Sequence, residues 1–194
     1  MSRSSDADGR ERVVPLPTVE ATRRLGAALG RMLRRGDLVV LTGDLGAGKT
    51  TLTQGLGETL GVRGPVTSPT FVIARSHPSI VGGPALVHVD AYRLSGGLEL
   101  DDLDLDTALE DSVAVVEWGS GLAELLSAHR LEIVLQDDGP SSWPGAGAGT
   151  GDPSSDVPRR AVLRAVGSRW TSPQAEQALD ALVDAPVGGR RTDG

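Results

Sequence analysis

The segment 43–50 constrains the fold of this chain more than any other feature. Its sequence, GDLGAGKT, matches the phosphate-loop pattern G-x-x-x-x-G-K-[ST] at every fixed position. The apolar run 38–41 precedes it and is typical of a buried parallel strand, and a helix is predicted over 49–60, ending at Gly61. A glycine-rich turn between a strand and a helix directs backbone N–H groups and the positive end of the helix dipole at phosphate oxygens. The sequence therefore predicts an α/β domain built around a phosphate-binding loop.

The single lysine of the chain, Lys49, occupies the lysine position of this loop. The motif assigns Lys49 to the β- and γ-phosphates of a nucleotide and the hydroxyl of Thr50 to Mg²⁺. The rest of the predicted phosphate cradle consists of Gly43, Asp44, Leu45, Gly46, Ala47, Gly48 and Thr51.

Composition narrows the class of protein further. The chain has 194 residues, 39% of them apolar, which is enough for one buried core. It has no cysteine, which excludes disulfides, thiolate metal sites and cysteine nucleophiles. No apolar run approaches the roughly 18 residues of a membrane span, and the polar N-terminus lacks a signal-peptide pattern, so we expect a cytoplasmic protein. The net charge of −7 argues against broad electrostatic capture of nucleic acid by this chain alone.

Strands and helices alternate along the chain, which predicts a phosphate-loop α/β fold with a mostly parallel central sheet, antiparallel additions and helices on both faces. We expect a disordered leader over 1–12, one domain over 13–170 and a C-terminal helix and tail over 171–194, with a flexible low-complexity segment at 138–158. The strands are predicted over 13–16, 38–41, 71–75, 85–90, 113–117, 131–135 and 161–166. The helices are predicted over 19–35, 49–60, 120–128 and 172–183, with one or two short ones over 95–111. Pro15 and Pro17 confine the first strand to a sheet edge, and Thr18 is the predicted N-cap of the first helix.

Other classes of phosphate-loop protein fit less well. The chain has no asparagine and its one lysine lies in the loop, so the N/T-K-x-D motif that reads guanine in the common GTPases cannot occur. Residues 94–97 (LSGG) resemble the start of the ABC-transporter signature, but Leu98 replaces its glutamine and the spacing from Lys49 is too short. A small-molecule kinase remains an alternative, although the candidate lid arginines lie on or beside a predicted strand: Arg159, Arg160, Arg164 and Arg169.

Two predicted strands end in a carboxylate. Asp90 closes the strand 85–90 and Glu117 closes the strand 113–117, and a metal–nucleotide site needs acids at the carboxyl ends of strands beside the phosphate loop. One carboxylate can hold Mg²⁺ while the other polarises the attacking water. Thr70, in the segment 68–71 (SPTF), is a further candidate to sense the γ-phosphate or bind Mg²⁺.

These motifs together resemble one family. The loop GDLGAGKT, SPTF, H-x-D-x-Y-R at 88–93 and V-E-W at 116–118 occur in the order and spacing of the bacterial TsaE family, also called YjeE. The resemblance covers roughly residues 13–137. It implies an ATPase needed for the threonylcarbamoyl modification of adenosine 37 in tRNA, which docks on the TsaB–TsaD pair and meets tRNA only through that complex. It also implies ATP and Mg²⁺ as cofactors.

The resemblance implies a role for each of several residues. It implies that Lys49 and the loop glycines bind phosphates, that Thr50 and Glu117 bind Mg²⁺, and that Asp90 serves catalysis or the metal. It further implies that Val19 borders the adenine and that Trp118 lies beside the nucleotide.

The chain departs from the family in places, and alternatives stay open. Gly119 stands where the family commonly has proline, and neither the segment 138–158 nor the residues after Trp170 have a transferable role. The acidic stretch 90–117 is either a solvated helical face, or a docking surface for a basic partner, or a screen that keeps RNA off this subunit. A small-molecule kinase and a nucleotide-gated binding module remain the alternative functions.

Overall fold

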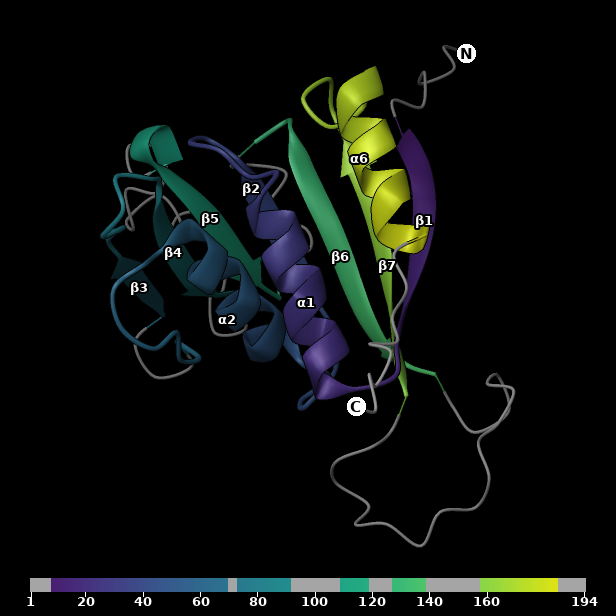
Figure 1. Ribbon diagram of the computed structural model, residues 1–194, viewed down its shortest axis with the longest axis horizontal. Coiled ribbons are helices and arrows are strands. Elements are labelled where there is room, and N and C mark those ends of the chain that lie inside the picture. The colour runs from purple at the N-terminus through teal and green to yellow at the C-terminus, as the bar shows by residue number, and fades with distance from the viewer. Residues whose placement is uncertain (1–7, 70–72, 92–108, 119–126, 139–157, 185–194) are drawn as a thin grey trace, which may run out of the picture.

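The computed structural model describes residues 8–69, 73–91, 109–118, 127–138 and 158–184. Its centre is a seven-stranded sheet in the order β1-β7-β6-β2-β5-β4-β3 (Figure 1). The strands are β1 (Asp8–Leu16), β2 (Leu38–Thr42), β3 (Ala74–His77), β4 (Ala85–Asp90), β5 (Ser112–Glu117), β6 (Arg130–Asp137) and β7 (Arg159–Val166). The helices are α1 (Val19–Gly30), α2 (Lys49–Leu60) and α6 (Pro173–Asp184).

The middle of the sheet is parallel and its flanks are antiparallel. Strand β2 pairs in parallel with β5 and β6, and β4 pairs in parallel with β5. The flanking pairs β1–β7, β6–β7 and β3–β4 are antiparallel. This confirms the predicted mixed sheet with a parallel centre, and it confirms the proline-containing first strand as an edge strand. The loop after β2 consequently leaves the carboxyl edge of the sheet between two parallel neighbours.

The three helices cover one face of the sheet (Figure 1). The main core is continuous from α1 and α2 to α6, and Leu29, Leu52 and Leu179 in it are fully buried. A second, smaller core lies on the opposite face, where Leu109 packs with Val40 and Val87. Most of the predicted helices over 95–111 and 120–128 fall outside the described residues, as does nearly all of the segment 138–158.

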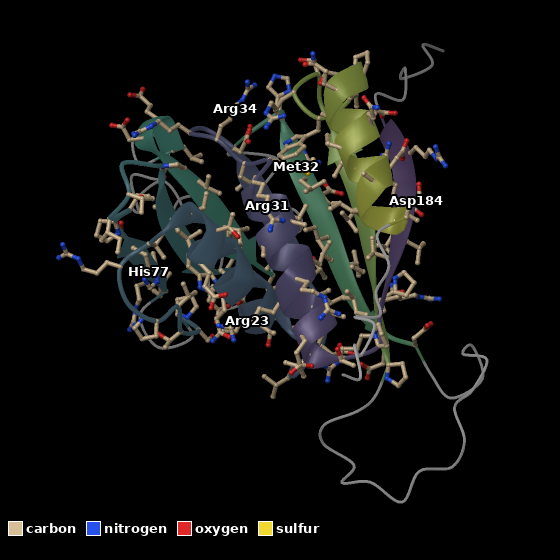
Figure 2. The ribbon with its side chains drawn as sticks, viewed as in Figure 1. Arg23, Arg31, Met32, Arg34, His77 and Asp184 are labelled. Carbon is tan, nitrogen blue, oxygen red and sulfur yellow. The ribbon has the colours of Figure 1, made fainter. Side chains whose placement is uncertain are left out.

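Helices α1 and α2 pack closely through glycine. A Cβ on Gly26 would collide with the carbonyl oxygen of Leu52, and one on Gly55 would collide with that of Arg23. At the surface, Arg23 forms a two-pronged ion pair with Glu58 of α2 (Figure 2). The close contact therefore depends on the absence of side chains at these two positions.

Several predicted boundaries shift. The leader expected over 1–12 is wrong from Asp8 onward, because β1 continues pairing with β7 as far as Asp8 opposite Val166. Helix α1 begins after the predicted N-cap Thr18, whose hydroxyl accepts a hydrogen bond from the N–H of Ala21, but ends at Gly30 rather than near Arg35. The carboxylate of Asp37 accepts the N–H of Arg34 and stabilises a turn there instead. Strand β3 covers Ala74–His77, and residues 71 and 72 of the strand predicted over 71–75 lie outside the described residues.

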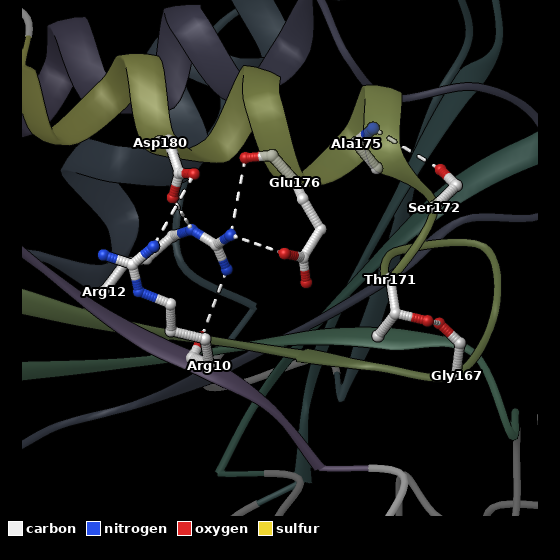
Figure 3. A network of polar contacts seen from close by, with 8 residues as sticks. All are labelled: Arg10, Arg12, Gly167, Thr171, Ser172, Ala175, Glu176 and Asp180. Carbon is white, nitrogen blue, oxygen red and sulfur yellow. Dashed lines mark hydrogen bonds and ion pairs between the residues drawn. The ribbon is translucent and has the colours of Figure 1, made fainter.

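The buried Arg12 explains why the early residues are ordered. Its side chain is 2% exposed, and its Nε donates a 2.6 Å hydrogen bond to Asp180 of α6 (Figure 3). Its Nη2 lies 3.3 Å from the carboxylate of Glu176 on the same helix. Strand β1 and helix α6, from opposite ends of the chain, are thus held together by a charged network that sequence proximity does not suggest.

No helix among the described ranges combines the length and the apolar character that a membrane crossing requires.

Candidate nucleotide-binding site

Most of the predicted site residues meet in one cavity. It has a volume of about 650 Å³ and lies at the carboxyl ends of β2, β4 and β5, where the first turn of α2 begins. Its lining consists of Leu45, Gly46, Gly48, Lys49, Thr50, Thr51, Ser68, Asp90, Glu117 and Trp118. The carboxyl edge of a parallel sheet is where α/β proteins bind nucleotides, so both the place and the composition fit such a ligand.

Backbone conformation shapes the loop. Gly48 has φ 103° and is the N-cap of α2, so a left-handed residue directs the chain into the helix. Gly48 offers no side-chain acceptor to the first-turn N–H groups of α2, which are the groups that an anion can take. A Cβ on Gly43 would lie 2.6 Å from the carbonyl oxygen of Leu135, so the start of the loop also needs glycine.

Lys49 is buried and directed at its own loop. Its side-chain nitrogen Nζ donates to the carbonyl oxygen of Gly43 at 2.7 Å and to that of Asp44 at 3.0 Å. Nζ also lies 4.4 Å from the centre of the Trp118 ring, a cation–π distance. Burial lowers the pKa of Lys49 below its ordinary value, while Glu117, Asp90 and Asp44 oppose that shift by favouring the charged form. The cation is therefore held in place before any phosphate arrives.

The two strand-end carboxylates lie side by side. The parallel register of β4 and β5 sets Asp90 opposite Glu117, and both residues are buried, at 6% and 4% exposure. Residues Leu86, His88 and Asp90 alternate onto the face that α2 covers, as strand periodicity requires. The carboxylates and Lys49 therefore contribute opposite charges to one cavity.

Trp118 joins the site because the strand ends before it. Along a continuing strand its ring would project to the face opposite Glu117. Instead Trp118 has φ 61°, in the left-handed region, and its N–H donates to the carbonyl oxygen of Leu41 at 2.9 Å. The turn brings the indole over Lys49 on the cavity side.

The residues present suit Mg²⁺ bound together with a nucleotide. The described part of the chain contains no group of three or more His, Asp or Glu that could hold a metal by itself. Mg²⁺ commonly takes one or two protein carboxylates and completes its shell with phosphates and water. Asp90, Glu117 and the hydroxyl of Thr50 line the same cavity, and this donor set matches that preference.

Four described residues of the predicted site do not line the cavity: Val19, Gly43, Asp44 and Ala47. Val19 is 43% exposed at the start of α1, and the other three belong to the phosphate loop itself. Thr70 lies outside the described residues. The neighbour of Thr70 in the SPTF segment, Ser68, does line the cavity.

Two side chains near the site were not among the predicted site residues. His88 has its Nε2 2.8 Å from the Oε1 of Glu117. Its spacing of two residues from Asp90 on a strand is the signal that could have indicated a shared face. Arg159 of β7, a candidate lid arginine only under the kinase alternative, has an Nη1 atom 3.9 Å from the position that a Cβ on Gly48 would take.

Comparison with known proteins identifies relatives along most of the chain. The family described as "Threonylcarbamoyl adenosine biosynthesis protein TsaE" matches residues 16–142. A protein of Streptomyces coelicolor named tRNA threonylcarbamoyladenosine biosynthesis protein TsaE is 56% identical over 151 residues, covering 77% of this chain and 94% of that protein. A protein of the same name from Mycobacterium tuberculosis H37Rv is 58% identical over 128 residues, covering 62% of this chain and 76% of the relative.

A solved structure agrees with these sequence matches. The crystal structure of YdiB from Bacillus subtilis superposes with a TM-score of 0.64 at 28% identity, covering 90% of this chain and 95% of that one. The family match spans more than half of the chain and includes the phosphate loop, both carboxylates and Trp118. The chain therefore belongs to the TsaE family of threonylcarbamoyl adenosine biosynthesis proteins, which have a phosphate-loop nucleotide-binding fold.

Proposed function

We propose that this chain is the ATP-binding and ATP-hydrolysing subunit of the machinery that forms N6-threonylcarbamoyladenosine at position 37 of tRNA, and that it acts with the TsaB–TsaD pair. The observation that carries the proposal is the convergence of Lys49, Asp90 and Glu117 on one cavity at the phosphate loop. Membership of the TsaE family supports the modification as the process served.

Each site residue has its own role in phosphoryl transfer to water. The loop N–H groups and Lys49 bind the β- and γ-phosphates and stabilise the charge that develops there. Thr50 and Glu117 hold Mg²⁺, which when bound neutralises phosphate charge. Asp90, buried beside Glu117, orients the attacking water and accepts its proton. Trp118 covers Lys49 and limits the access of bulk water to the phosphates.

The proposed partners bind the tRNA. This chain's net charge of −7 disfavours direct capture of tRNA, so tRNA reaches the subunit only through the complex. ATP hydrolysis here supports repeated rounds of transfer rather than the transfer itself.

ATP hydrolysis by the purified chain, alone and with a TsaB–TsaD pair, tests the proposal. We expect low activity alone and higher activity with the pair. We expect Lys49→Ala to abolish both, because it removes the cation at the phosphates. Activity that ignores the pair contradicts complex dependence, and acceptor-dependent release of ADP would then identify a small-molecule kinase. Full tRNA modification by a hydrolysis-deficient Asp90→Ala chain would instead identify a nucleotide-gated binding module.

A further inference from the structure

A buried histidine contacts one of the two site carboxylates. The imidazole of His88, in the middle of β4, is fully buried, and its Nε2 lies 2.8 Å from the Oε1 of Glu117 at the end of β5. The Glu117 side chain is 5% exposed, so water cannot readily replace this contact. A hydrogen bond in such surroundings is stronger than one in water, and breaking it leaves a buried acceptor unsatisfied.

The environment of the ring indicates which nitrogen carries the proton. The other ring nitrogen, Nδ1, is buried and has no hydrogen-bond partner within the described ranges. An unpartnered lone pair on Nδ1 costs less than an unpartnered N–H, and a carboxylate oxygen can only accept. The hydrogen between the two side chains therefore belongs to Nε2, whose N–H donates to the carboxylate of Glu117.

This bond orients the carboxylate toward the cavity. One carboxylate oxygen of Glu117 accepts the hydrogen bond from His88. The second oxygen is then left for a ligand in the cavity that Glu117 shares with Lys49 and Thr50. Carboxylates that ligate metals are commonly oriented by such outer hydrogen bonds, and losing one typically weakens metal affinity by about 10–100-fold. We propose that His88 is a positioning residue that holds Glu117 in the orientation needed to bind Mg²⁺ with the nucleotide. This inference rests on the proposed function.

The test separates metal binding from nucleotide binding. A fluorescent ATP analogue is titrated into the wild-type chain and its variants, first in EDTA and then with increasing Mg²⁺. We expect His88→Leu to bind the analogue like the wild type in EDTA but to need about tenfold more Mg²⁺ for the same gain in affinity. His88→Gln, whose longer amide can donate from near the position of Nε2, restores most of the Mg²⁺ response. His88→Asn, whose amide is too short, does not.

A second buried histidine provides the matched control. His77 on the neighbouring strand β3 is 5% exposed (Figure 2). Within the part of the chain that the structure describes, its Nε2 also lacks a hydrogen-bond partner, and it forms no hydrogen bond with Glu117. His77→Leu therefore removes a buried imidazole and leaves the Mg²⁺ response unchanged. If His88→Leu does not fold, the contrast between His88→Gln and His88→Asn gives the same answer.

A double-mutant cycle shows whether His88 acts through Glu117. In a Glu117→Gln background, adding His88→Leu produces no further change in the Mg²⁺ response. A wild-type Mg²⁺ response in His88→Leu and His88→Asn overturns the inference, as does an equal loss of affinity in EDTA or a full shift in the Glu117→Gln background. A wild-type chain that shows no Mg²⁺-dependent nucleotide binding contradicts the proposed function itself, so the two failures are distinguishable.

Discussion

Lys49 shows how one side chain can organise a site before its ligand binds. Its ammonium is held by two carbonyl oxygens of its own loop and lies against the Trp118 ring. Little side-chain entropy is then left to lose when phosphate binds. Its role was predictable because the motif is local, with glycines, lysine and threonine at set spacing. The contact between His88 and Glu117 was not predictable, because 29 residues separate the partners.

At this scale we expect Glu117→Ala to impair metal-dependent turnover more than nucleotide binding. The substitution removes a proposed Mg²⁺ ligand but leaves Lys49 and the loop N–H groups, which bind phosphates directly. Turnover with Mg²⁺ should fall about 100-fold or more, whereas the affinity for ATP in EDTA should change by less than about threefold. Steady-state hydrolysis and equilibrium binding provide the two measurements. Normal turnover in this variant would exclude Glu117 as a metal ligand.

At the scale of elements, the crossing of α1 over α2 positions the phosphate loop. Helix α2 begins at Lys49, so any displacement of this helix also displaces the lysine and the first-turn N–H groups. Close approach is possible because Gly26 and Gly55 each face a backbone carbonyl of the other helix. The bounds of α2 were predicted correctly from its sequence, but the need for glycine at these two positions appears only when the helices are packed.

We expect Gly26→Ala to destabilise the chain even though alanine has the higher helix propensity. The new Cβ would meet the carbonyl oxygen of Leu52, which belongs to backbone and cannot swing aside. Overpacking of this kind costs about 1–3 kcal/mol, against a propensity gain of about 1 kcal/mol. Urea unfolding should therefore show a net loss of up to about 2 kcal/mol.

Gly83→Ala is the matched control, since its Cβ would make only ordinary 3.4 Å contacts and its backbone is not in the left-handed region. It should shift stability by less than about 0.5 kcal/mol. Equal stability of the Gly26→Ala chain and the wild type would show that the helices separate at little cost.

At the scale of the whole molecule, the two ends of the chain complete the sheet together. Strand β1 pairs with β7, and the buried Arg12 links β1 to Asp180 and Glu176 of α6. The buried His77 also ties the stability of the fold to pH. Burial, together with nearby His88 and Arg75, lowers the pKa of His77 below its ordinary value, and a hydrogen bond to the Arg63 backbone only partly offsets this.

We expect the stability of the wild-type chain to fall as pH is lowered below about 6.5. The unfolded chain protonates His77 near pH 6.5, whereas the folded chain does so only at lower pH, so acid favours the unfolded state in that interval. The contribution of His77 to the free energy of unfolding is complete above about pH 6.5 and is lost as the pH falls toward the pKa of His77 in the folded chain. Thermal unfolding at several pH values between 7.5 and 5.5 measures it. His77→Gln should flatten the dependence, and an unchanged slope would show that His77 is not its source.

The sequence by itself determined the local parts of this protein. The phosphate loop, helix α2 from Lys49 to Leu60, the strand Ala85–Asp90 and the Thr18 cap all depend on residues within a few positions of one another. Propensity, capping and the motif are local properties, so they can be read along the chain. The two carboxylates were also predicted to be strand ends, because each strand is a short apolar run closed by an acid.

Only the tertiary structure decided how these parts meet. The register of β4 on β5 sets Asp90 opposite Glu117, and the end of β5 turns Trp118 onto Lys49. The contacts of His88 with Glu117 and of Arg12 with Asp180 join segments that are 29 and 168 residues apart. Such contacts depend on strand register and helix packing. Many alternative pairings of strands and helices are compatible with the local sequence, so the energy of the whole fold selects among them.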